Sequence, residues 1–179
     1  MNETALFDKL TSLGVNQYGQ IDVSAIPFKE EVRKMCEANS CGKYGTNWQC
    51  PPAVGEVSAL RERVLSYPNA VLFNTVGALE DSFDFEGMME AGAKHGEITG
   101  EINRFLRENN ADFLLLGAGG CTKCKPCAYL SGKPCVKPEE AIASVEACGI
   151  FVVDLCRMSG FKYINGENTV TYFSLILYR

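Results

Sequence analysis

The sequence contains a single histidine, a single tryptophan and no apolar run long enough to cross a membrane. It also lacks any block of basic residues, and its formal net charge is −5. This acidic balance argues against nucleic acid and against an anionic membrane as the main partner. The first residues lack the basic start and the apolar segment of a signal peptide, so we expect a cytoplasmic protein.

The common patterns of catalysis are missing as well. The sequence shows no carboxylate pair, no nucleophile with a matching base and no nucleotide-binding loop. The glycines of residues 117–120 lack the G-x-G-x-x-G spacing of a dinucleotide site. His95 lies on the apolar stripe of an expected helix, where a histidine is more often a core residue than a cluster ligand or a proton donor.

Cysteine, by contrast, is abundant, with nine residues in the chain. In a chain without a secretion signal, cysteines bind metals more often than they pair, and an odd number cannot all form internal disulfides. The densest group is Cys121-Thr122-Lys123-Cys124-Lys125-Pro126-Cys127, with Cys135 eight positions further on.

The spacing of this group indicates the kind of metal. In bacterial ferredoxins a C-x2-C-x2-C run supplies three corners of a [4Fe–4S] cluster. Structural zinc sites usually take two ligands from each of two separated C-x2-C pairs, so a third close cysteine favours the cluster. Nearby lysines would stabilise an anionic cluster, although they also serve to keep an exposed loop in solution: Lys123, Lys125, Lys133 and Lys137. Zinc and reactive or disulfide-forming thiols are the alternatives.

A second group precedes the first by about seventy residues and consists of Cys36, Cys41 and Cys50, the last followed by two prolines. The ferredoxin run also ends in Cys-Pro, which favours Cys50 as a ligand over a buried thiol. With three cysteines, this group needs an outside ligand, a substrate or a place on the other group's cluster. Trp48 beside it could shield a cluster or be an ordinary core aromatic.

The two groups together resemble a family of predicted metal-binding proteins of unknown function from bacteria and archaea, many of them anaerobes. The resemblance spans about residues 30–155 and is carried by the pattern C-x4-C-x8-C-P-P from Cys36 and the pattern C-x2-C-x2-C-x7-C from Cys121. It implies iron–sulfur binding and no particular reaction. Relatives often have an aromatic residue where Cys148 stands, which implies that Cys148 is not a ligand. Cys156 also lies outside any ligand spacing, and both are expected to be buried.

Helices and strands alternate along the chain, which predicts a single α/β domain over residues 1–179 with a mixed central sheet flanked by helices; an α+β two-layer fold is the alternative. Parallel crossovers are expected between the buried strands, and Asn165-Gly166 predicts a C-terminal hairpin. Helices are expected at 3–13, 28–38, 54–66, 85–109 and 138–147, and strands at 21–26, 70–76, 111–116, 150–153 and 169–178. The cysteine loop should follow the strand 111–116, at its carboxyl end.

From these patterns we expect a protein with one or two [4Fe–4S] clusters bound by Cys121, Cys124, Cys127, Cys135, Cys36, Cys41 and Cys50. Cys135 is the favoured fourth ligand of the C-terminal group because closing its short loop costs little entropy, and Cys50 is the alternative. The favoured function is single-electron transfer to a redox partner protein. The alternatives are an enzyme whose open cluster iron binds a small-molecule substrate, and a zinc-stabilised interaction module. Whether Cys135 or Cys50 completes the first cluster, the two groups should be neighbours in the fold.

Overall fold

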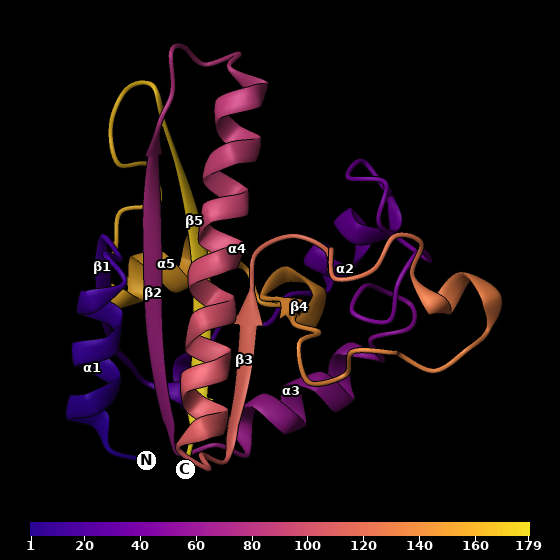
Figure 1. The fold of residues 1–179 in the computed structure, drawn as a ribbon, viewed down its shortest axis with the longest axis horizontal. Coiled ribbons are helices and arrows are strands. Elements are labelled where there is room, and N and C mark those ends of the chain that lie inside the picture. The colour runs from indigo at the N-terminus through magenta and orange to yellow at the C-terminus, as the bar shows by residue number, and fades with distance from the viewer.

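The computed structural model describes residues 1–179, which form a five-stranded sheet with helices around it (Figure 1). The order of the strands is β1-β2-β5-β3-β4. Only β3 and β4 pair in parallel, and the other neighbours are antiparallel. The strands are β1 (Gln17–Ile21), β2 (Asn69–Ala78), β3 (Phe113–Gly117), β4 (Ala143–Ser144) and β5 (Thr169–Tyr178). The helices are α1 (Glu3–Ser12), α2 (Glu30–Glu37), α3 (Val57–Leu65), α4 (Phe85–Glu108) and α5 (Val152–Ser159).

Helices cover both faces of the sheet because alternate residues of its long strands point in opposite directions. On one face α1 and α4 pack over Val71 and Phe73 of β2. On the other face α3 and α5 pack over Leu72, together with the short 3-10 helices η1 (Val23–Ala25) and η3 (Glu146–Cys148). This arrangement confirms the predicted α/β class with a mixed sheet.

The long helix α4 is continuous, as predicted, although Gly92, Gly96 and Gly100 recur along it. A Cβ at Gly92 would lie 3.2 Å from the ring of Tyr172, whose hydroxyl donates to the Met88 carbonyl at 2.7 Å. Gly92 therefore makes room for a side chain of β5. Gly96 has no neighbour within 4 Å of such a Cβ, so no second backbone approaches the middle of the helix.

The predicted strand over residues 21–26 is wrong, because β1 ends at Ile21. The carboxylate of Asp22 accepts a hydrogen bond from the Ser24 backbone at 2.8 Å. Such a local bond from side chain to backbone favours a turn over a strand. The strand itself comes earlier, over the largely polar residues 17–20, whose composition does not show the alternation of a half-buried strand.

The predicted helix over 138–147 and the predicted strand over 150–153 are both wrong. Within the first segment β4 pairs with the end of β3, and this sheet pairing outweighs the helix propensity of a run rich in glutamate and alanine. In the second, α5 begins at Val152 and buries Leu155 and Cys156 at helical spacing. A reading restricted to four apolar residues cannot distinguish a strand from the start of a buried helix.

The last strand does not close a hairpin at Asn165-Gly166, so this prediction is also wrong. β5 instead lies between β2 and β3 and pairs antiparallel with both, so that Leu175 stands opposite Leu72 on one side and Leu116 on the other. As a result β2 and β3 run parallel to each other without touching. The expected parallel arrangement is therefore present, since α4 connects β2 to the parallel strand β3 and β3 pairs in parallel with β4, but β5 is inserted between β2 and β3.

Two loop regions project from one side of the sheet and lie together (Figure 1). We call them, residues 38–55 and 118–137, the cysteine lobe. Their only regular element is the 3-10 helix η2 (Ala128–Ser131). No helix of the chain is both long enough and apolar enough to cross a membrane.

Candidate metal centre

The C-terminal cysteine loop leaves the carboxyl end of β3, as predicted, and meets the N-terminal group at once. Gly120 has no room for a side chain, because a Cβ there would lie 2.9 Å from Lys43 Cγ and 3.3 Å from Cys50 Sγ. Only glycine allows so close an approach of backbone to another segment. Cys121, the first cysteine of the loop, therefore starts directly beside Cys50.

The four cysteines of this loop line one pocket. They are all partly exposed at its wall. The volume open to a water-sized sphere is about 10 Å³, room for about one water molecule, so the side chains close over the centre. The lining residues are Trp48, Gln49, Cys121, Lys123, Cys124, Cys127, Cys135, Lys137 and Ala141.

The chemistry of this lining fits a thiolate-bound metal group. Thiolates are the ligands of iron–sulfur clusters and of many zinc sites. Lys123 and Lys137 line the same pocket, and their positive charges would stabilise an anionic cluster bound there. The sulfur positions are not those of a formed site, since no group of three or more His, Cys, Asp or Glu side chains is arranged to hold a metal ion. The site therefore suits a metal group in the kind of ligand that it offers and in the pocket that these ligands share.

Trp48 fastens the two loops of the cysteine lobe to each other. Its Nε1 donates a hydrogen bond to the carbonyl of Lys133 at 3.0 Å. Its ring meets that of Tyr129 edge-on, with 5.1 Å between the ring centroids. Both partners belong to the stretch between the third and fourth cysteines. Because Trp48 also lines the pocket, it covers the thiols.

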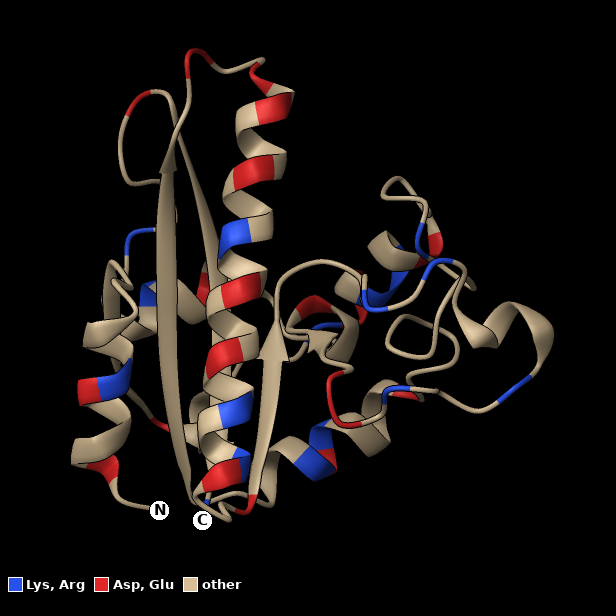
Figure 2. Ribbon diagram, in the orientation of Figure 1, with Lys and Arg blue, Asp and Glu red and all other residues tan.

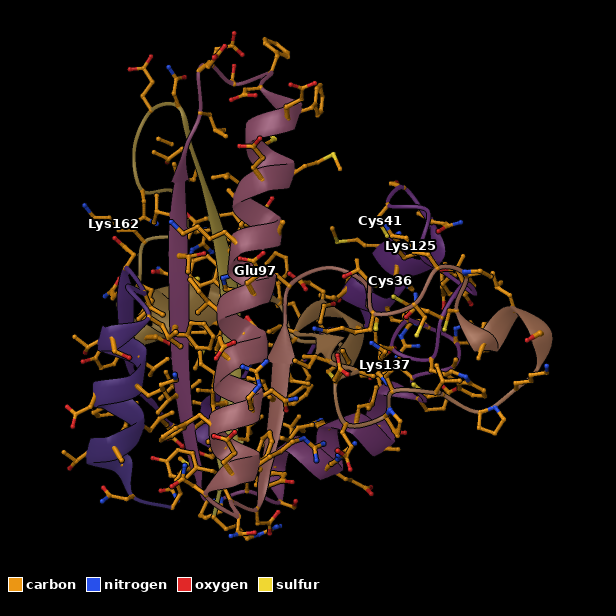
Figure 3. All side chains as sticks on the ribbon, in the orientation of Figure 1. Cys36, Cys41, Glu97, Lys125, Lys137 and Lys162 are labelled. Atoms are coloured by element: carbon orange, nitrogen blue, oxygen red, sulfur yellow. The ribbon has the colours of Figure 1, made fainter.

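The N-terminal group lies on the last turn of α2 and in the loop that follows, where Figure 3 labels two of its members. Cys41 is exposed, Cys36 is partly buried and Cys50 is buried. Burial raises the pKa of the Cys36 thiol; Arg33 opposes this rise, and Cys41 and Cys50 add to it. The three thiols therefore belong to one region of the protein, at the end of α2 and in the loop after it.

The prediction that the two cysteine groups are neighbours is confirmed. Burial is the main cause that raises the pKa of Cys50, and the charge of Cys121 adds to it while a hydrogen bond from the Cys121 backbone lowers it. The contact at Gly120 and the hydrogen bond of Trp48 join the same two loops. Ligation of a metal by either group stays a prediction.

The remaining candidates lie in the core. His95 is buried, with Nδ1 2.8 Å from Thr75 Oγ1 and Nε2 2.8 Å from Ser174 Oγ. Burial lowers its pKa to about 4, so the imidazole is neutral. Burial also raises the pKa of Cys148 and of Cys156 to about 12, which keeps both as thiols. All three are buried core residues, as predicted.

Sequence reasoning missed two cations beside the N-terminal group. Lys43 packs its stem against Gly120. Arg33 donates from Nη2 to the carbonyls of Gly55 at 2.8 Å and Ala147 at 3.2 Å, and its buried Nε has no partner. Arg33 thus ties α2 to the end of the N-terminal loop and to η3. In the sequence, Arg33 is marked only by its place next to the apolar Val32. That position does not distinguish an arginine that bridges two segments from one that is exposed to water.

The fold and the pocket define an α/β protein with a thiol-rich candidate metal site. Residues 19–178 match a family model described as predicted metal-binding protein (DUF2284). The chain belongs to this family of predicted metal-binding proteins, as the resemblance in its two cysteine motifs indicated. The description gives neither the metal nor a reaction. No curated protein and no solved structure matches the chain.

Proposed function

We propose that the protein binds a [4Fe–4S] cluster through Cys121, Cys124, Cys127 and Cys135 and transfers single electrons to a redox partner. The observation that carries this proposal is that these four thiols line one pocket. A [4Fe–4S] cluster takes up and releases one electron at a potential that its surroundings tune. The protein's part is to hold the thiols, to exclude water and to set the local charge.

Individual residues have separate roles in this proposal. Trp48 covers the thiols and lowers the local polarity. Lys123 and Lys137 lie on the pocket wall, where their positive charges favour the reduced site and so raise its potential. Electrostatic effects of this kind are stronger where water is excluded. Gly120 permits the close contact that positions Cys121.

Zinc is the competing metal, since four thiolates also suit a tetrahedral ion. The spacing of the loop favours the cluster: a third cysteine at C-x2-C-x2-C spacing fits the three corners of a cube, as in bacterial ferredoxins. A zinc site here would make the lobe a structural module without redox chemistry.

A second candidate function is the binding of a small-molecule substrate at an open iron. The observation that favours it is that Cys50, the last of the three thiols Cys36, Cys41 and Cys50, lies against Gly120 and so directly beside Cys121. If these three hold a second cluster, one of its irons has no cysteine and can take a substrate. If Cys50 instead completes the first cluster, Cys135 is left for the second site.

Anaerobic purification followed by analysis of iron, zinc and acid-labile sulfide tests the proposal. One cluster gives about four irons and four sulfides per chain, and two clusters give about twice as many. Dithionite reduction should produce an EPR signal, because the reduced cluster has an unpaired electron. Stoichiometric zinc without sulfide, in protein never exposed to oxygen, contradicts the proposal and favours the structural module.

A further inference from the structure

The cysteine lobe differs in charge from the rest of the molecule. Of the chain's 17 basic and 22 acidic residues, the lobe holds five of the basic ones and none of the acidic ones. The remaining residues therefore carry a net charge of −10. Figure 2 shows blue segments in the lobe, while red predominates along α4 and in the loop before it. A basic lobe thus sits on an acidic body.

The five basic residues are all lysines and all exposed: Lys43, Lys123, Lys125, Lys133 and Lys137. Lys123 and Lys137 line the thiol pocket, and Lys137 also faces Glu140 at 3.7 Å. Lys125 and Lys133 neither line the pocket nor form a salt bridge. Their charges are available to another molecule.

Exposed apolar side chains accompany these lysines beside the candidate ligands. Leu130 is 62% exposed and lies between the third and fourth cysteines, and Val136, next to Cys135, is 66% exposed. Met35, beside Cys36, is also 66% exposed. Exposed apolar residues among charged ones are typical of protein interfaces. These three side chains are exposed on the segments that carry the candidate ligands, where a redox partner would come near the thiols.

We propose that the cysteine lobe is the docking surface for an acidic one-electron carrier protein, a proposal that rests on the proposed redox function. Leu130 and Val136 supply the apolar contact, and Lys125 and Lys133 attract the carrier. On docking, one electron passes from the reduced carrier to the oxidised metal site; the carrier is oxidised, the site is reduced, no bond forms or breaks and no proton moves.

The charges select this partner in two ways. Opposite charges on two proteins speed their encounter and orient it. The net charge of −10 on the rest of the molecule repels an acidic carrier, whereas the basic lobe attracts it, so that the carrier arrives beside the thiols. Nucleic acid is a poorer fit, because the lobe contains no arginine, the residue best suited to bidentate phosphate contacts, and the acidic body repels a long polyanion.

A pair of charge-reversal variants tests the proposal with a reduced, acidic bacterial-type ferredoxin as the probe. The test variant is Lys125→Glu with Lys133→Glu, and the control is Lys9→Glu with Lys162→Glu, which changes the net charge equally. Figure 3 shows Lys125 on the lobe and Lys162 on the far side of the sheet. Iron and sulfide are counted first in the anaerobically purified proteins. Binding to immobilised ferredoxin and the second-order rate of electron transfer are then measured at low and high NaCl.

At low salt the test variant should bind and react at least about tenfold more slowly than the parent, and this difference should be smaller at high salt. The control should stay within about twofold of the parent. Equal losses in both variants, or no loss in either, overturn the docking surface. So does tighter binding of a DNA oligonucleotide than of ferredoxin through the same two lysines. Salt-dependent binding at these lysines by protein without iron and sulfide supports the surface while refuting the proposed cluster. Full cluster content without ferredoxin binding refutes the surface alone.

Discussion

The sheet body and the cysteine lobe are held together in different ways. The body buries two apolar clusters, one on each face of the sheet. The lobe has few hydrogen-bonded elements, and its buried residues are only Asn47, Cys50 and Pro51. Burial of apolar surface is the main force that stabilises a domain, so the body has what it needs to fold. The lobe lacks such a core, and a bound metal group would supply the missing stabilisation.

The largest effect should come from a cavity in the body. Phe73 is fully buried, and Phe73→Ala should lower the free energy of unfolding by about 3–5 kcal/mol. Denaturant titration measures this, and the metal content per folded chain should stay unchanged. Phe83→Ala is the control, since Phe83 is 78% exposed and its loss should leave the stability nearly unaltered. Loss of metal in folded Phe73→Ala would show that the two regions are not separable.

Acid should weaken the body through His95. Its pKa is about 4 in the folded chain against 6.5 for the free group, so the unfolded chain binds the proton more readily. The stability is fully present above pH 6.5 and is lost as the pH falls towards 4, by about 3 kcal/mol in total. Unfolding of metal-stripped protein at pH 7 and pH 4 measures the loss. His95→Gln should remove this part of the pH dependence; an unchanged dependence would contradict the role of His95.

Substitution of a lobe cysteine should affect metal content more than stability. Cys124→Ala should lose the C-terminal cluster and lower Tm by only a few degrees, since about 1 kcal/mol corresponds to roughly 2–4 °C at this chain length. Cys156→Ala should leave the metal content unchanged, because Cys156 is buried in the body. Equal iron in Cys124→Ala and the parent would refute the ligand assignment, and iron loss in Cys156→Ala would show that its role was misjudged.

Two glycine substitutions give the smallest effects, of opposite kinds. Gly96→Ala should stabilise the body by up to about 1 kcal/mol, because the helix gains propensity and the new methyl group meets nothing within 4 Å. Gly120→Ala should displace Lys43 and Cys50 and reduce the bound metal with little change in unfolding. A metal loss in Gly96→Ala, or full metal in Gly120→Ala, would contradict the separation of body and lobe.

The sequence predicts those helices and strands whose apolar residues recur at the spacing typical of a helix or a strand. β2 and α4 are long and regularly patterned, and both lie close to where they were expected. β1 is polar, β4 has two residues, and α5 begins in a short apolar run, so none of them has a clear local pattern. The place of β5 between β2 and β3 depends on pairing across most of the chain, which no local window contains.

For the candidate site, the spacing of cysteines was informative because one cluster needs several sulfurs close together. The two groups are neighbours, as that reasoning required: Cys36 lies on the last turn of α2, and the other six candidate ligands lie in the two loops of the lobe. The contacts that join them were not predictable, since Gly120 against Cys50 and Trp48 against Tyr129 connect segments distant in sequence. The bridging role of Arg33 likewise arises only from the tertiary fold.

Hydrogen exchange of the anaerobic protein, before and after chelators remove its metal, tests the central comparison most directly. The amides of residues 118–137 should lose protection when the metal is removed, because the lobe has no apolar core of its own. The amides of β2, α4 and β5 should keep theirs. Equal protection of residues 118–137 in both states, or loss of protection throughout the sheet, would contradict the view that burial orders the body and metal orders the lobe.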